Sequence, residues 1–163
     1  MKNLMIQISG KLGHTLWGFK HLPLMKSPTM IIGIDVCKKV GKNDRTVVCL
    51  VSSIDKHIGK FYSDYESIGE NQELPLPIEK MFKKAIMEFE QKNSNASPKN
   101  LIIYRDAVSE GQAEETLNTE VSQIKSAISS LMNSGDLSSE PQVLFMLANK
   151  RIEQRFWTEN RQK

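Results

Sequence analysis

Two aspartates end apolar, strand-like runs at positions where they could hold metal ions. Asp35 lies near the end of the run IIGIDV, and Asp106 is the last residue of the run LIIYRD. A carboxylate at the end of a buried strand is costly unless something binds it, and two carboxylates can share divalent ions. Hydrolysis of a phosphodiester with two metal ions needs such groups on rigid strand ends. Spacing alone leaves another interpretation open, in which Asp35 caps a turn and Asp106 caps the following helix.

A third acidic candidate lies in the segment GENQELPLP, ahead of a predicted helix. Glu73 in this flexible, acidic loop could swing into a metal site, with Glu70 and Glu79 as rivals. An ordinary solvated loop accounts for the same composition. The residues by themselves leave both interpretations open.

Basic residues at two places are candidates for contacts with phosphate groups. Lys11 lies between Gly10 and Gly13, and glycines let a backbone approach a phosphate closely. Lys150 and Arg151 end the last predicted strand and could line a groove for a nucleic-acid backbone. A surface lysine in a turn and solvated charges are the plain alternatives.

Composition indicates one domain of ordinary globular character. The chain has 163 residues, of which 39% are hydrophobic and 25% charged, so it is long enough for a real core. No apolar run approaches the roughly 20 residues that span a bilayer. The start lacks the pattern of a secretion signal, so we expect a cytoplasmic or nuclear protein. Cys37 and Cys49 are expected to be small core residues in a reducing compartment.

Charge is distributed unevenly along the chain. Residues 1–60 carry ten lysines and arginines against three acids, whereas the whole chain has a net charge of only +3. A basic N-terminal third is compatible with a polyanionic partner, although charge alone favours a solvated positive face.

Hydrophobic periodicity predicts an α/β domain with the order βββαβαβ. Residues 4–10 fit a short helix or strand, and residues 14–19 a short strand. Alternating or β-branched runs predict strands at 30–37, 46–54, 59–65, 101–106 and 143–150. Helical spacing predicts helices over 78–89 and 117–131. The first three strands should form an antiparallel meander within a mixed sheet. If the first and fourth strands are neighbours, Asp35 and Asp106 can face one site.

Five blocks of the sequence resemble the Piwi domain of the Argonaute/Piwi family, and its Piwi branch in particular. The blocks are IQISGKLGHTLW, MIIGIDV, VVCLVSSI, LIIYRDAVSEGQ and VLFMLANKR, in the family's order and at its approximate spacings. They extend over nearly the whole chain. The resemblance implies a ribonuclease H-like fold, with residues 1–28 near the 5′ end of a guide and residues 29–163 as a truncated ribonuclease H-like core.

The resemblance also implies a function and a set of site residues. The family cleaves target RNA paired to a small guide RNA, using Mg²⁺ (or Mn²⁺) held by four residues. Asp35 and Asp106 match the first and third acids, and Glu73 best matches the mobile glutamate. Lys11 matches a lysine that contacts the guide's 5′ phosphate. A basic element after the fifth strand matches Lys150 and Arg151.

Departures from the family pattern leave a second hypothesis open. The fourth metal-site residue and the last helix are expected beyond Lys163, and the Mid and PAZ domains before residue 1. Ala107 stands where the family usually has glycine. The alternative is therefore a non-catalytic RNA-binding or regulatory fragment, or an incomplete gene model. Without the last helix, one face of the sheet should expose apolar residues.

Overall fold

The computed structural model describes residues 2–16, 18, 23–39, 45–55, 57–69, 76–106 and 110–149. Its elements are α1 (Lys2–Lys11), a short 3-10 helix (Pro23–Lys26), β1 (Thr29–Lys39), β2 (Arg45–Ser53), β3 (Phe61–Gly69), α2 (Ile78–Lys92), β4 (Asn100–Asp106), α3 (Glu110–Ser134) and β5 (Gln142–Ala148). From β1 onward the predicted order βββαβαβ is confirmed.

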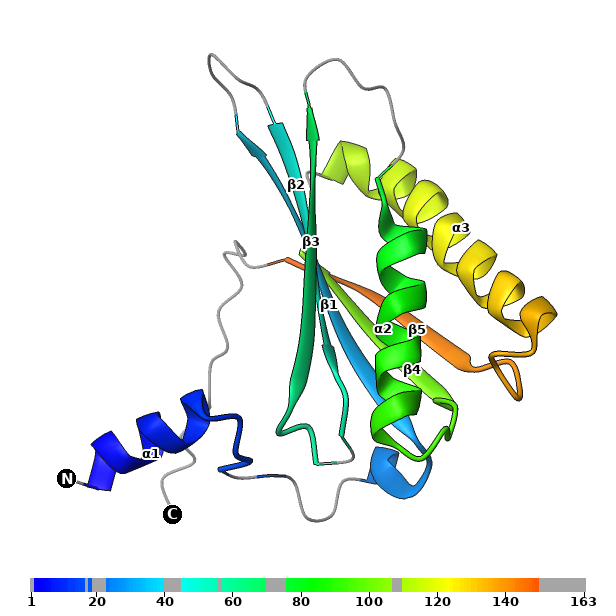
Figure 1. Ribbon diagram of the computed structural model, residues 1–163. Coiled ribbons are helices and arrows are strands. Elements are labelled where there is room, and N and C mark those ends of the chain that lie inside the picture. Colours follow the sequence, from blue (N-terminus) through cyan, green and yellow to red (C-terminus); the bar gives the residue numbers. More distant parts are fainter. Residues whose placement is uncertain are drawn as a thin grey trace, which may run out of the picture.

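The five strands form one mixed sheet in the order β3-β2-β1-β4-β5 (Figure 1). β1, β2 and β3 are the predicted antiparallel meander, whereas β4 runs parallel to both β1 and β5. Parallel strands need a crossover connection, which α2 and α3 supply. β1 and β4 are therefore direct neighbours, as the placement of the two aspartates required.

Helices α2 and α3 lie on the same side of the sheet and cover that face (Figure 1). The apolar residues of α2 recur every three or four positions, so they share one face of the helix. All of them are buried: Ile78, Met81, Phe82, Ala85, Ile86 and Phe89. They pack with alternate residues of the strands and with the buried side of α3, including Met30, Ile32, Ile34, Leu101, Ile103, Ile124, Ala127, Ile128 and Leu131. Burial of this shared apolar surface drives the assembly of the layers.

The opposite face of the sheet is partly open. Side chains alternate between the two faces of a strand, so residues next to the core positions point away from α2 and α3. Large apolar side chains on this face are exposed: Val51, Phe61, Tyr65, Tyr104 and Leu144. The expected exposure of apolar residues on one sheet face is thus observed.

Helix α1 ends in a glycine-dependent motif. The N–H of Gly13 donates to the carbonyl of Gly10 at 3.0 Å, and the N–H of His14 donates to that of Ser9 at 3.1 Å. Gly13 has φ of 79°, and this left-handed residue with its two hydrogen bonds is a Schellman helix end. Gly10 lies inside the helix, which ends at Lys11, one residue beyond the predicted end at residue 10.

Two smaller predictions fail. Residues 14–16 and 18 have no strand structure, because an aromatic run becomes a strand only where a neighbouring strand pairs with it. Cys37 is exposed and Cys49 half-buried, because alternation turns Ile34 toward the helices and Cys37 toward the open face. No helix within the described ranges is long and apolar enough to cross a membrane.

Candidate metal centre at the ends of β1 and β4

The register of the sheet brings Asp35 and Asp106 to adjacent positions. The last pair of the parallel β1–β4 ladder joins Ile34 to Arg105, and the two aspartates are the next residue on each strand. Neighbouring strands lie about 5 Å apart. The two carboxylates therefore start from neighbouring backbone positions at the place where the two strands part.

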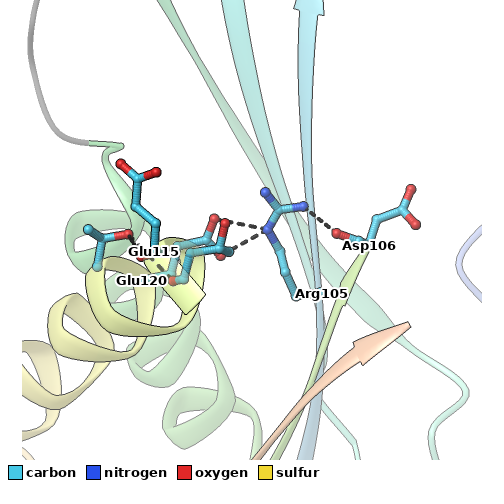
Figure 2. Close-up of polar contacts among 6 residues, drawn as sticks. Arg105, Asp106, Glu115 and Glu120 are labelled. Atoms are coloured by element: carbon cyan, nitrogen blue, oxygen red, sulfur yellow. Dashed lines mark hydrogen bonds and ion pairs between the residues drawn. The ribbon is translucent and has the colours of Figure 1, made fainter. Parts of the chain in front are cut away.

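Both aspartates point away from the helices. Ile34 and Arg105 are buried on the helix-covered face, at 2% and 4% exposure, so their successors face the other side. Asp35 is exposed and Asp106 is half-buried. Figure 2 shows the carboxylate of Asp106 directed away from the Arg105 guanidinium. The acidic pair thus lies on the open face of the sheet.

Asp35 lies inside its strand, whose observed end is two residues beyond the predicted end at residue 37. β1 continues to Lys39, and Asp35 is paired with Cys49 of β2. The apolar run ends near Asp35 because β1 loses its neighbour β4 there. Pairing with β2 continues through Val36 and Cys37 to Lys39. Residues before and after Asp35 therefore belong to the same strand, whereas Asp106 is the last residue of β4.

Chain connections make this position suited to ligand binding. From β1 the chain turns to β2 on one side, whereas from β4 it passes through α3 to β5 on the other side. Ligands of open α/β sheets bind beyond the carboxyl ends of strands where the connections diverge in this way.

A buried ion pair supports the strand end from the helix side. Arg105 Nε donates to both carboxylate oxygens of Glu120, at 3.0 and 2.8 Å, and Nη1 donates to the Asp106 carbonyl at 2.6 Å (Figure 2). Arg105 and Glu120 are only 4% and 2% exposed. The sequence interpretation missed this pair, although Glu120 lies one helical turn before the buried Ile124.

The other predicted site residues are placed less directly. Lys11 is exposed at the C-terminal end of α1, a helix that lies to one side of the sheet (Figure 1). The strand pairing that brings the two aspartates to adjacent positions therefore does not determine where Lys11 lies. The remaining predictions lie outside the described residues, namely those for Glu70, Glu73, Ala107, Lys150 and Arg151.

Glu79, a rival for the third acid, belongs to a different part of the fold. It lies in the first turn of α2, where Lys83 Nζ donates to its carboxylate at 2.7 Å. The hydrogen bond from Lys83 keeps the pKa of Glu79 below its usual range. This carboxylate is engaged on the side of the sheet opposite Asp35. Within the described ranges, no group of three or more His, Cys, Asp or Glu residues could hold a metal ion.

The sheet order and the position of the acidic pair define a ribonuclease H-like domain, and solved structures agree with this fold. The structure of Kluyveromyces polysporus Argonaute with a guide RNA has a TM-score of 0.77 and 21% identity, over 93% of this chain and 18% of that chain. Drosophila Piwi has a TM-score of 0.69 and 26% identity, over 87% of this chain and 18% of that chain.

Sequence comparison identifies the family. The Piwi domain profile matches residues 1–163, so the chain belongs to the Piwi domain family. Piwi-like protein 1 of Schmidtea mediterranea is 32% identical over 153 residues, which cover 93% of this chain and 18% of that protein. The chain thus spans about a fifth of that relative's length. The predicted family and ribonuclease H-like fold are confirmed.

Proposed function

We propose that the chain acts with a small guide RNA paired to a complementary target RNA, and that Asp35 and Asp106 hold Mg²⁺ or Mn²⁺ for cleavage of the target. The observation that carries this proposal is the β1–β4 register, in which the two aspartates follow the last paired residues and both belong to the open face of the sheet. The family membership supports the choice of substrate.

The two side chains suit the proposed ion. Mg²⁺ and Mn²⁺ prefer hard oxygen ligands, and carboxylates provide them. A bound divalent ion would supply activated water and charge stabilisation at the phosphate. Asp35 would contribute its carboxylate from a strand that β2 keeps rigid, and Asp106 from a strand end that the Arg105 guanidinium contacts. Glu73 is the proposed third acid.

Basic side chains complete the proposed interface with RNA. Lys11 would contact the guide's 5′ phosphate through its ammonium group alone. It lies at the C-terminal end of α1, and the partial negative charge at that end of a helix does not attract phosphate. Lys150 and Arg151 would contact the backbone of the paired strands. The domain would recognise the duplex by its backbone shape, since base pairing with the guide supplies the sequence information. We place residues 1–28 at the guide end and the protein in the cytoplasm or nucleus.

A cleavage assay with a matched control tests the proposal. The purified chain is incubated with a guide–target duplex and Mg²⁺ or Mn²⁺, beside the variants Asp35→Asn and Asp64→Asn. Asp64 also lies in the sheet, on β3, but on the helix-covered face where Lys84 binds it at 3.0 Å. We expect metal-dependent cleavage that Asp35→Asn abolishes and Asp64→Asn retains.

Two results would overturn parts of the proposal. RNA binding that weakens with salt and does not change in Asp35→Asn, without metal-dependent cleavage, would replace the catalytic function with the non-catalytic alternative. No binding of the duplex even at low salt would remove RNA as the partner.

A further inference from the structure

We infer that the buried Arg105–Glu120 pair positions the Asp106 carboxylate for metal binding, an inference that rests on the proposed function. Arg105 reaches Glu120 of α3 through Nε and the Asp106 carbonyl through Nη1. One planar guanidinium thus joins the helix to the last residue of β4. Arg105 is a positioning residue, because its contact with Asp106 is through the backbone.

The contact between Arg105 and the Asp106 carbonyl lies where the pairing of β1 with β4 ends. The β1–β4 ladder ends at Arg105, so within the described ranges β5 is the strand paired with Asp106, through Ala148. The guanidinium adds a restraint from the helix side at the position where that ladder ends. Metal sites need ligands held to within about 0.5 Å of their productive geometry. A restraint on the Asp106 backbone therefore affects the site even though Arg105 faces the other side of the sheet (Figure 2).

Stability alone is a weak reason for such a pair. Replacing a buried ion pair with apolar side chains of similar volume is often neutral or stabilising. Such a replacement of Arg105 and Glu120 separates the two roles, because it fills the space and removes the bond to the Asp106 carbonyl. The variant Arg105→Lys separates the stabilising role from the positioning role in a second way, since an ammonium group keeps the charge but lacks the planar set of donors of a guanidinium.

Mn²⁺ affinity measured by electron paramagnetic resonance tests the inference. The chain is compared with Arg105→Met/Glu120→Leu and with the control Asp64→Leu/Lys84→Met, which removes an ion pair between β3 and α2 without changing net charge. Circular dichroism first establishes the temperature range in which each variant is folded. We expect Mn²⁺ to bind the first variant about tenfold more weakly, as for other residues that support metal ligands. The control should stay within about twofold of the unsubstituted chain.

The outcomes separate this inference from the proposed function. If the unsubstituted chain binds no Mn²⁺, the proposed metal site fails and the inference fails with it. If the chain binds Mn²⁺ and the folded Arg105→Met/Glu120→Leu variant binds it equally well, only the positioning role is overturned. Should that variant not fold, Arg105→Lys decides the question: weaker Mn²⁺ binding by the folded protein supports the role, and unchanged binding overturns it.

Discussion

Asp35 and Asp106 are the first residues beyond the Ile34–Arg105 pair of two parallel strands, and both face the open side of the sheet. Two neighbouring carboxylates repel each other when no cation lies between them. In the proposed metal site, a bound cation would relieve this repulsion.

The first prediction concerns this repulsion. In EDTA, Asp35→Asn should raise the free energy of unfolding by up to about 1 kcal/mol, the range for cross-strand charge pairs. Urea unfolding of both proteins measures the change. The control Asp64→Asn should lower stability instead, because it loses the ion pair with Lys84. A loss of stability in Asp35→Asn would contradict the proposed repulsion.

The second prediction concerns the buried pair. Arg105→Ala should lower the free energy of unfolding by about 3–5 kcal/mol, because the Glu120 carboxylate stays buried without its partner. Glu120→Ala should have a similar cost. In urea unfolding, the double variant should lose less than the sum of the single losses. Additive losses would show that the two side chains stabilise the fold independently.

The third prediction compares two adjacent serines of β2. Both are fully buried, but they differ in their hydrogen bonds. The Ser52 hydroxyl has no partner among the described residues, whereas the Ser53 hydroxyl accepts a hydrogen bond from the Ile31 N–H at 2.9 Å. Ser53→Ala should cost about 1–3 kcal/mol by leaving that N–H unsatisfied, and Ser52→Ala should be neutral or stabilising. Thermal unfolding of the two variants checks the difference, and equal losses would contradict it.

The fourth prediction concerns acid sensitivity. Burial alone would raise the pKa of Asp64, but the hydrogen bond and charge of Lys84 and the Tyr65 N–H outweigh it and hold the pKa below its ordinary value. A lowered pKa in the folded state stabilises the protein above the ordinary aspartate pKa of about 3.9, and this stabilisation is lost as the pH falls through the folded value. The pair is partly exposed, with side-chain exposures of 46% for Lys84 and 18% for Asp64, so the contribution is below about 1 kcal/mol.

Urea unfolding as a function of pH measures this contribution. Between about pH 6 and pH 3, Lys84→Met should lose less stability on acidification than the unsubstituted chain. The variant Lys83→Met removes the ion pair that lowers the pKa of Glu79, so it should change the pH dependence in the same direction. An identical pH dependence in Lys84→Met and the unsubstituted chain would contradict the role of Asp64.

Sequence predicted the layers of the fold because periodicity reports burial directly. The spacing from Ile78 to Phe89 marks the face of α2 that packs on the sheet, and the alternation over β3 marks a half-exposed strand. The same signal misplaced the end of β1, since backbone pairing with β2 continues to Lys39 after burial ends. Hydrophobic patterns do not report hydrogen bonding between polar strands.

The candidate site required more than local pattern. Each aspartate was found from its own strand, but their adjacency depends on strand order and on register, which distant parts of the chain determine together. The Arg105–Glu120 pair joins residues fifteen positions apart on different elements, and nothing in either segment names its partner. Glu120 was recognisable only as an acid on the buried stripe of α3.

Titration with Mn²⁺ tests the central claim, that Asp35 and Asp106 together form a metal site. Electron paramagnetic resonance should show saturable binding by the chain, strong weakening in both Asp35→Asn and Asp106→Asn, and little change in Asp64→Asn. The proposed site is contradicted if the unsubstituted chain binds no Mn²⁺, or if Asp35→Asn and Asp106→Asn bind it as well as the unsubstituted chain does.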